Sequence, residues 1–483
     1  MVKFLHSVKS FNVMRTLIIF LLCFTASLST AQSVVLTPQQ MRADLDYLNK
    51  YLRKWHPSYY AYTEKEDMNA FYSRLKDSCT TPTSASAFTP TIYKAVNKVG
   101  CGHMGIWGFR GISTGKSAAL LPVKVWVLNN RLFIKSALKK DSTLKMGDEI
   151  LAINGEKAAD LIEKTAELAV TDGLNQTHKM YSLEYAFNAF YYFIYGKQDN
   201  YTLKIKNRAG EISDVTIPSD TLKNEFTAYK IVKDTANRVI KGNAVALYKT
   251  DFDASTMVID IDNFSGSGQG KTFKKIFRHL RKQGTKNVVI DLRDNGGGNV
   301  FKGNKFLTYF LDAPITPLVI SRKPNLTFIN PHFKGGFFEK ITPILFTINP
   351  LQYPNRNGWN HCFLFFKKYR NHFDGNVYVM TNGGTFSMAS YVASYLQHKK
   401  QATVVGEETG GSEYGSRAMA GGHITLPNSD VKIQFNIYQM THQLNIEDKG
   451  HGVMPNHTTQ YTIEDKLTGK DIDIEVIKSL IKK

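Results

Sequence analysis

Residues 376–397, NVYVMTNGGTFSMASYVASYLQ, constrain the fold more than any other part of the chain. Val377 and Val379 indicate a short buried strand, and Asn382-Gly383-Gly384 then breaks the regular backbone. Residues 387–396 carry apolar side chains at helical spacing. The segment therefore predicts a strand, a tight turn and a helix in direct succession, with a serine where the helix begins.

This serine, Ser387, has two interpretations. The first turn of a helix has unpaired N–H groups and the positive end of the helix dipole. Both stabilise a developing oxyanion, so the position suits a nucleophile. Serine is also a common helix N-cap, whose side chain only accepts a hydrogen bond from the helix backbone. The segment alone leaves both interpretations open.

A second glycine-rich turn follows a βαβ pattern. Residues 257–261 and 287–292 are predicted strands, and residues 272–282 between them form a basic amphipathic helix. The turn after the second strand reads DNGGGN, at the carboxyl end where α/β sheets bind ligands. Its spacing matches neither a dinucleotide-binding turn nor a P-loop. The alternative is an oxyanion hole, in which a backbone N–H of Gly296 or Gly297 faces a substrate carbonyl.

The first 31 residues have the layout of a secretory signal peptide. Residues 1–15 are basic and contain no acid, residues 16–24 are apolar, and small residues at Ser29 and Ala31 precede Gln32. The apolar run is too short to span a bilayer. Cys23 lacks the preceding small residues of a lipoprotein signal. We therefore expect a soluble exported chain, periplasmic or secreted, with no transmembrane helix after cleavage.

Charge and cysteine content indicate neither nucleic acid nor metal as a partner. The formal net charge of +20 includes three cations of residues 1–31, whose removal leaves +17. The lysines are scattered, and no nucleic-acid-binding motif occurs, so a basic solvated surface is the better interpretation. Cys79, Cys101 and Cys362 remain; Cys79–Cys101 is one conceivable disulfide. No group has metal-ligand spacing, so we expect neither metal nor cofactor.

The N-terminal part is predicted to be helical. Thr37 begins a capping box, with apolar residues at helical spacing after it, and further helices are expected at 64–77 and 91–98. His103 follows in the sequence VGCGHMG, where glycines on both sides leave the imidazole uncovered on a turn. A single histidine in a loop is usually a surface residue.

The next part is predicted to be rich in strands. Residues 122–128 and 131–136 form a hairpin around Asn129-Asn130, and residues 158–170 a helix. The sequence GDEILAING at 147–155 resembles the strand–turn signature of a PDZ domain, a module that takes peptide C-termini onto a sheet edge. Two closing strands are expected at 201–206 and 212–217.

Four motifs together resemble those of the C-terminal processing (tail-specific) serine proteases. They are, in order, IDLRDNGGGN, NGGTFSMAS, VVGEETGG and GHGVMPN. The resemblance implies an α/β protease core of the ClpP/crotonase-like type and a nucleophile at Ser387. It also implies an oxyanion hole formed by Gly296, Gly297 and the amide of Met388.

The chain departs from the Ser–Lys dyad found in this family. No lysine follows the third motif. The nearest basic residue downstream is Arg417, whose guanidinium stays protonated and cannot accept a proton. The chain is similar instead to the tricorn-like branch, which implies His103 as general base and Glu447 as the residue that orients it. His451 and His442 are competing bases. Asn456 stands where the family usually has aspartate, with no clear consequence.

The sequence thus predicts a multidomain α/β chain. Its expected parts are a signal peptide at 1–31, a helical cap at 32–108, a PDZ-like domain at 109–220 and a catalytic core at 221–483 with a long aromatic loop at 323–375. The predicted function is that of an exported serine endopeptidase acting on polypeptides. The PDZ-like domain either selects substrates by their free C-terminus or serves only as a scaffold. The alternatives are a hydrolase of another acyl substrate and a degenerate member that binds peptides or apolar ligands without turnover. The oligomeric state stays open.

Overall fold

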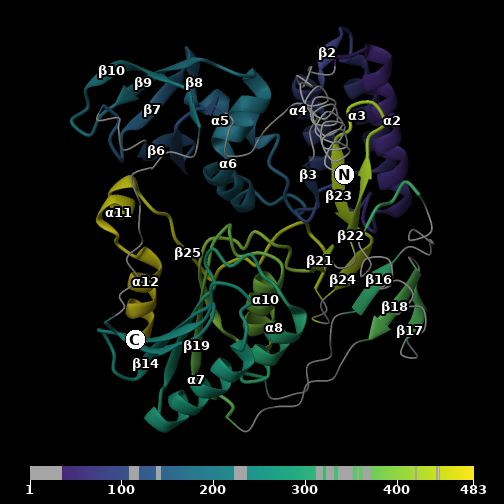
Figure 1. The fold of residues 1–483 in the computed structure, drawn as a ribbon. Helices are drawn as coiled ribbons and strands as arrows, with labels where there is room; N and C mark the ends of the chain where they lie inside the picture. The colour runs from purple at the N-terminus through teal and green to yellow at the C-terminus, as the bar shows by residue number, and fades with distance from the viewer. Residues whose placement is uncertain are drawn as a thin grey trace, which may run out of the picture.

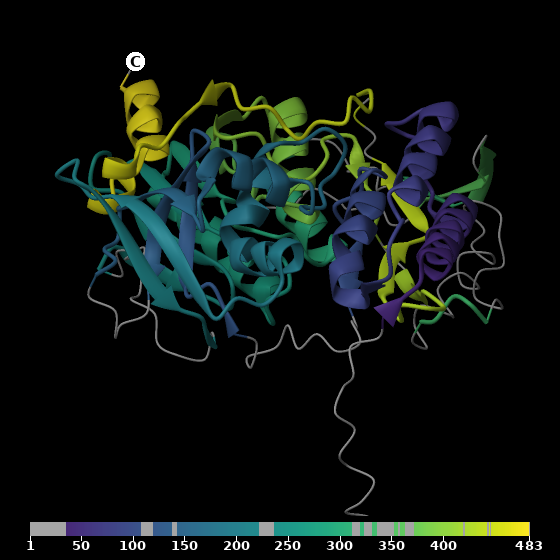
Figure 2. The same cartoon turned by 90° about the horizontal axis from the view of Figure 1, so that it is seen from above.

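The structure is a computed structural model, and it describes residues 35–107, 119–137, 143–221, 236–311, 319–322, 331–335, 352–355, 358–362, 371–418, 421–441, 444 and 446–482. The predicted signal peptide lies outside these residues. Figure 1 shows the catalytic sheet and its helices below the PDZ region and the N-terminal helices. Figure 2 shows the PDZ strands toward one end of the molecule and the N-terminal helices toward the other.

Three helices form the N-terminal part, as predicted: α2 (Pro38–Trp55), α3 (Lys65–Asp77) and α4 (Ala85–Asn97). Thr37 makes the predicted capping box with Gln40. Helix α4 starts earlier than expected because Ser84 caps it, accepting a hydrogen bond from the Ala87 N–H. The short strands β1 (Val35–Leu36) and β2 (Thr83–Ser84) pair with each other.

The strand after these helices joins them to the C-terminal half. Strand β3 (Gly105–Trp107) pairs with β23 (Lys432–Asn436), which pairs with β22 (Gly421–Thr425). The fully buried Asp44 of α2 accepts hydrogen bonds from the backbone N–H groups of Asn428 and Ser429. The pairing of β3 with β23 places the turn that carries His103 against the C-terminal half.

The PDZ region is a sheet in the order β10-β9-β7-β6-β5, with β8 paired to β7. Its elements are β5 (Val123–Leu128), β6 (Arg131–Ala137), β7 (Glu149–Ile153), β8 (Glu156–Lys157), α5 (Ala158–Ala166), α6 (Thr177–Tyr195), β9 (Asn200–Lys206) and β10 (Ile212–Pro218). The predicted hairpin is confirmed, with Asn129 and Asn130 at φ of 53° and 57°. Helix α6 was not predicted. The pair β4 (Ala119–Leu120) and β11 (Asp220–Thr221) joins the ends of this region.

The core contains a seven-stranded sheet in the order β12-β13-β14-β15-β19-β20-β25. Its strands are β12 (Arg238–Lys241), β13 (Ala246–Lys249), β14 (Thr256–Asp260), β15 (Asn287–Asp291), β19 (Asn376–Thr381), β20 (Thr403–Gly406) and β25 (His457–Thr458). From β14 to β25 every pairing is parallel, as the predicted βαβ pattern requires. The packed helices are α7 (Gln269–Gln283), α8 (Val300–Leu307), α10 (Met388–Lys400), α11 (Ile463–Thr468) and α12 (Ile472–Ile481).

The segment predicted as a long aromatic loop at 323–375 contains two strands, so that prediction was wrong in part. Strands β17 (Gln352–Asn355) and β18 (Gly358–Cys362) join β16 (Val319–Arg322), β24 (Tyr438–Thr441) and β21 (Gly415–Ser416) in a second sheet. The pattern gave no signal because these strands are short and the other strands of their sheet are distant in sequence. The remaining residues of that segment lie mostly outside the described part of the chain.

A buried ion cluster fixes the end of β15 to the C-terminal helix. The Arg293 guanidinium is 2.8 Å from carboxylate oxygens of Asp291, Asp471 and Asp473. The Arg293 side chain is 20 % exposed and that of Asp473 only 2 %. These carboxylates hold the pKa of Arg293 well above its usual value, against the opposing effect of burial.

Replacing Arg293 should therefore destabilise the protein. We expect Arg293→Ala to lower the free energy of unfolding by about 3 kcal/mol, because it leaves partly buried carboxylates without their counterion. Arg208→Ala is the matched control: its ion pair with Glu464 is 60 % exposed on both sides and should change stability by less than about 0.5 kcal/mol. Urea unfolding of both variants measures the difference, and equal stabilities would contradict the cluster's proposed role.

Candidate active site

Three turns meet at the carboxyl ends of the parallel strands. β15 leads into the glycine turn, β19 into the turn that carries Ser387, and β20 into residues 407–411. The glycine turn and the Ser387 turn border a pocket of about 130 Å³, lined in part by Gly298, Val300, Ser387, Met388, Tyr391 and Met440. This is the location that the sequence predicted for the site.

The backbone at Ser387 is strained and its side chain does not cap the helix. Ser387 has φ of 54° and ψ of −118°, a conformation that costs a non-glycine residue on the order of 1–3 kcal/mol. It occupies the N-cap position of α10, yet its side chain makes no capping hydrogen bond. The N-cap interpretation of this serine is therefore not observed, and Ser387 instead lines the pocket.

Gly297 packs directly against the turn that carries the serine. A Cβ atom at Gly297 would lie 2.7 Å from the Met388 nitrogen and 2.8 Å from the Ser387 Cβ, and its φ is 99°. The Gly297 N–H already donates to Asn295 Oδ1 at 2.9 Å. Gly297 therefore brings the two turns together, and its own amide is not free for an oxyanion.

Gly298 is the glycine of this turn that lines the pocket. Its neighbours bond the same strand-like segment: Phe264 N–H donates to the Gly297 carbonyl, and Asn299 N–H donates to the Phe264 carbonyl. The Gly298 N–H, on the opposite side of this ladder, is thus directed away from Phe264. Gly298 and Met388 both line the pocket, whereas Gly296 is not among the described residues that line it, and its Cβ would contact nothing within 4 Å. The sequence named Gly296, Gly297 and Met388 for the oxyanion hole; Met388 lines the pocket, and the roles of the amides stay a prediction.

His103 lies beside the nucleophile turn. Its ring centroid is 4.6 Å from that of Phe386, the residue before the serine, and His178 stacks on the same phenylalanine at 4.6 Å. His103 Nε2 is 3.1 Å from the Oγ of Ser416, which lines the pocket together with Ser387. In the described part of the chain, no hydrogen bond joins His103 to Ser387 and none satisfies the buried Nδ1.

Burial governs the electrostatics of His103. Loss of hydration lowers the pKa of this imidazole below 6.5, opposed by the negative charge of Asp172 and assisted by the positive charge of Arg417. A neutral imidazole is the form that can accept a proton from a hydroxyl. The environment therefore keeps His103 in the form required of a base near neutral pH.

The other predicted site residues are placed less favourably. Glu447 is exposed and makes no hydrogen bond to His103 within the described residues. His451 is 48 % exposed, and its Nδ1 is 3.2 Å from Glu408 Oε1. The side chain of His442 lies outside the described residues. Asn456 is structural, because its Oδ1 accepts a hydrogen bond from the Val404 N–H at 2.8 Å.

Sequence reasoning missed Asp172, which is 1 % exposed and lines the pocket. Its carboxylate accepts hydrogen bonds from the Gly102 N–H at 2.7 Å and the Ser412 N–H at 3.3 Å. It therefore bridges the His103 turn and the turn after β20. The only signal in the sequence is an acidic residue before Gly173, which by itself is common in turns.

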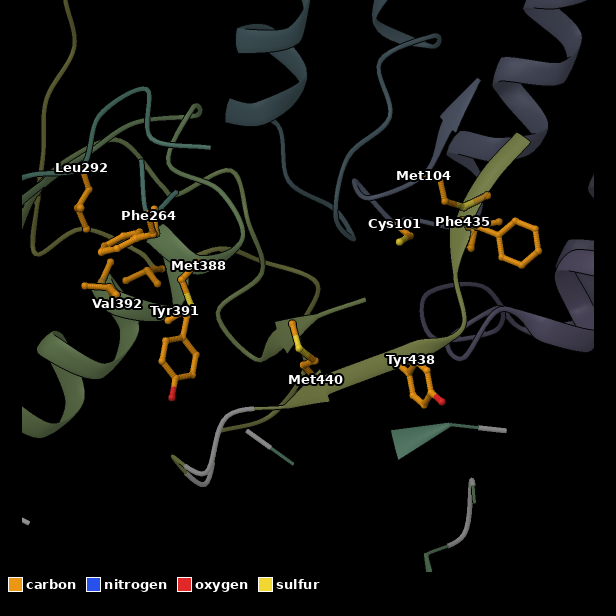
Figure 3. Close-up of a cluster of buried hydrophobic side chains, with 14 of the residues drawn as sticks. Cys101, Met104, Phe264, Leu292, Met388, Tyr391, Val392, Phe435, Tyr438 and Met440 are labelled. Atoms are coloured by element: carbon orange, nitrogen blue, oxygen red, sulfur yellow. The ribbon is translucent and has the colours of Figure 1, made fainter. Parts of the chain in front are cut away.

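The pocket wall opposite the polar groups is apolar. Figure 3 shows Met388, Tyr391 and Val392 of α10 with Phe264 and Leu292 in one buried cluster, and Met440 and Tyr438 on β24. Cys101 belongs to the same cluster. Burial raises the pKa of Cys101 to about 12, so this thiol stays protonated. Cys79 and Cys101 are both free, so the disulfide considered from sequence is not formed.

Helix α6 covers the free edge of the PDZ sheet, which is strand β5. The Glu184 carboxylate accepts a hydrogen bond from the Val127 N–H at 3.0 Å, and Leu183 and Phe187 pack in one core with Val125. A PDZ domain adds a peptide strand at a sheet edge by using such N–H groups. The N-terminal end of α6 reaches the active site, where His178 Nδ1 contacts the Gly383 carbonyl oxygen at 2.8 Å.

The parallel α/β core places a strained serine at the start of a helix and beside a glycine turn, as in a serine-type peptidase. Residues 255–459 match Peptidase family S41, and residues 117–226 match a PDZ domain. The chain therefore carries an S41 peptidase domain together with a PDZ domain, the domain pair of a tail-specific protease. No curated protein matches the sequence significantly.

The solved structures that are similar to this chain have low sequence identity to it. Mature CPAF complexed with lactacystin aligns with a TM-score of 0.68 at 15 % identity, over 92 % of this chain and 98 % of that chain. Another structure of mature CPAF aligns with a TM-score of 0.64 at 15 % identity, over 92 % and 97 %. The photosystem II D1 C-terminal processing protease aligns with a TM-score of 0.42 at 12 % identity, over 87 % and 93 %. The likeness to CPAF shows a shared fold across nearly the full length.

Two features are absent from the described residues. No helix there is long and apolar enough to cross a membrane. Within the same residues, no group of three or more His, Cys, Asp or Glu side chains is arranged to hold a metal ion.

Proposed function

We propose that the chain is an exported serine endopeptidase that hydrolyses peptide bonds through an acyl-enzyme on Ser387. The observation that carries the proposal is the strained, uncapped Ser387 in the pocket with Gly298 and Met388. A helix start and a glycine turn supply backbone N–H groups where negative charge develops on a substrate carbonyl. We assign the oxyanion hole to the amides of Gly298 and Met388, with Gly297 as the contact that brings them together.

His103 is the proposed general base. It removes the proton from the Ser387 Oγ as the oxygen bonds to the carbonyl carbon, and returns that proton to the leaving amine as the C–N bond breaks. Water then hydrolyses the acyl-enzyme with His103 again as base. For this, His103 exchanges its contact with Ser416 for one with Ser387; catalytic hydrogen bonds often tighten only when substrate binds. The orienting role of Glu447 stays a prediction.

The apolar lining of the pocket indicates that it binds an apolar substrate side chain next to the scissile bond. Val300, Tyr391, Ala418 and Met440 line it, and its volume is about 130 Å³. A cavity of about 150 Å³ accommodates benzene, so a valine or leucine side chain fits this space. The proposed substrates are therefore polypeptides with an aliphatic residue at this position.

Two other functions are compatible with the fold: hydrolysis of another acyl substrate, and ligand binding without turnover. One experiment on the chain lacking residues 1–31 separates them, with a fluorophosphonate probe and a library of peptides. We expect labelling of Ser387, none in Ser387→Ala, and cleavage of peptides after aliphatic residues. Labelling without peptide cleavage would favour another acyl substrate, and absence of both would favour a binding protein.

Export is a separate part of the proposal. It is supported by the basic, apolar and small-residue segments of residues 1–31. N-terminal sequencing of the protein from the culture medium or the periplasm should find Gln32 as the first residue. Protein that retains Met1 and stays in the cytosol would contradict it.

Recognition of a free C-terminus stays a prediction from the PDZ resemblance, and α6 provides a physical reason to expect the opposite. Its Glu184 occupies an N–H of β5 that a peptide strand would need. We therefore expect a peptide and its C-terminally amidated twin to be cleaved at equal rates, within about twofold, in a direct kinetic comparison. A strong preference for the free acid would show that α6 moves aside and that the domain selects tails.

A further inference from the structure

The catalytic histidine proposed above needs a negative charge close to it. When His103 accepts the proton of Ser387, an imidazolium forms at a partly buried position, and burial of an uncompensated charge is costly. Its Nδ1 is buried and has no hydrogen-bond partner among the described residues. Glu447, the carboxylate implied by the sequence, is exposed.

Of the charged groups that act on His103, Arg417 is already bonded to another carboxylate. Arg417 is 1 % exposed and donates to Asp448 Oδ2 at 2.6 Å, so these two charges compensate each other. The Arg417 Nε also donates to the Ser58 Oγ, which holds the guanidinium in place. Asp172 has no cation bonded to it in the described part of the chain, and only backbone N–H groups donate to its carboxylate.

Asp172 also fixes the position of the histidine turn. One carboxylate oxygen accepts the N–H of Gly102, the residue directly before His103, and the other accepts the N–H of Ser412, which lines the pocket. Gly102 has no room for a side chain, because a Cβ there would lie 2.7 Å from the Phe386 ring and 3.2 Å from the Asp172 nitrogen. The Asp172 carboxylate therefore connects the turn of His103 to the pocket lining through two hydrogen bonds.

We propose that Asp172, rather than Glu447, is the positioning residue of His103: it holds the histidine turn and supplies the negative charge that balances the imidazolium. This inference rests on the proposed function. In a serine–histidine–carboxylate arrangement the carboxylate orients the imidazole and stabilises its protonated form without taking the proton. Here the carboxylate acts on the backbone beside the histidine and through its charge.

The pH profile distinguishes this role from a structural one. Asp172, Arg417 and His178 are the charged or titratable groups that act on His103, and only Asp172 raises its pKa. The base works when neutral, so kcat/KM rises with pH through the pKa of His103. Removing the carboxylate charge lowers that pKa, and the acid-side inflection therefore moves to lower pH.

The experiment uses the chain lacking residues 1–31 with a cleaved peptide. We expect Asp172→Asn to lower kcat about a hundredfold, because a displacement of 1 Å at a reacting group has an effect of that size. The acid-side inflection of kcat/KM should fall by about one pH unit. Asp172→Glu keeps the charge and should restore most of the inflection shift.

Asp44→Asn is the matched control, since Asp44 is also fully buried and accepts two backbone N–H groups, but it lies in α2. It should lower the melting temperature and leave kcat and the inflection as in the wild type. Glu447→Gln, at an exposed position, should lower kcat less than tenfold and leave the inflection in place. If Asp172→Asn is not recovered folded, this variant alone tests whether Glu447 positions His103. An inflection that moves in Glu447→Gln, or stays in a folded Asp172→Asn, overturns the inference. A wild-type protein without turnover or labelling would instead refute the proposed function.

Discussion

Ser387→Ala and His103→Ala should each lower peptide turnover by about a thousandfold or more, and the double variant should be scarcely worse than either. The two side chains act in one concerted step, so the loss of either removes the whole step and the effects are not additive. The residual rate comes from substrate binding and the oxyanion hole. Steady-state kinetics with a peptide that carries an aliphatic residue before the cleavage site measures these losses.

The histidine assignment has its own control and its own rival. His279→Ala, on α7 and outside the pocket, should keep wild-type turnover. His451→Ala tests the competing base; because His451 is 48 % exposed and contacts Glu408, we expect a loss below tenfold. Normal turnover in His103→Ala together with an inactive His451→Ala would mean that the base is misassigned, while the role of the serine would stand.

Gly297→Ala should lower turnover by about a hundredfold or more, although it adds only one methyl group. The new Cβ would lie 2.7 Å from the Met388 nitrogen and 2.8 Å from both the Phe386 carbonyl oxygen and the Ser387 Cβ. Two of these atoms are backbone, so the serine turn itself must shift, and misplacement of reacting groups by 1 Å has an effect of this size. The φ of 99° adds backbone strain to an alanine.

Gly296→Ala is the matched control, one residue away. A Cβ at Gly296 meets nothing within 4 Å, so this variant should keep turnover within about threefold of the wild type. Both variants should retain the fluorescence spectrum of the folded chain. Equal activity of the two would show that Gly297 does not set the position of the nucleophile, and a loss confined to Gly296→Ala would support the oxyanion hole named from sequence.

Features set by neighbouring residues were predicted well. The Thr37 capping box, the Asn129-Asn130 hairpin and the strand–turn–helix junction at Ser387 all occur as expected. Each depends on backbone preferences within a few residues, which the sequence displays directly. The order of the four motifs was sufficient for the fold of the core and its family.

Helix α6 was missed for a physical reason. Its sequence, THKMYSLEYAFNAFYYFIY, has large apolar or aromatic residues on nearly every face, so helical periodicity is weak. Such a helix is buried on more than one side, and α6 indeed lies between the PDZ strands and the active site. The strands β17 and β18 were missed because they are short and pair within a sheet assembled from distant segments.

The sequence by itself determined the class of protein and the two turns that border the pocket, because these follow from local backbone geometry and motif order. Only the tertiary structure decided which glycine lines the pocket, which carboxylate bonds the turn of His103, and what covers the PDZ edge at β5. Gly296, Gly297 and Gly298 are the same residue in the sequence, and their amides differ through the pairing with Phe264 and the hydrogen bond from the Gly297 N–H to Asn295 Oδ1. Likewise, Asp172 meets His103 because the contact of Gly102 with Asp172 joins segments 70 residues apart, which no local pattern can encode.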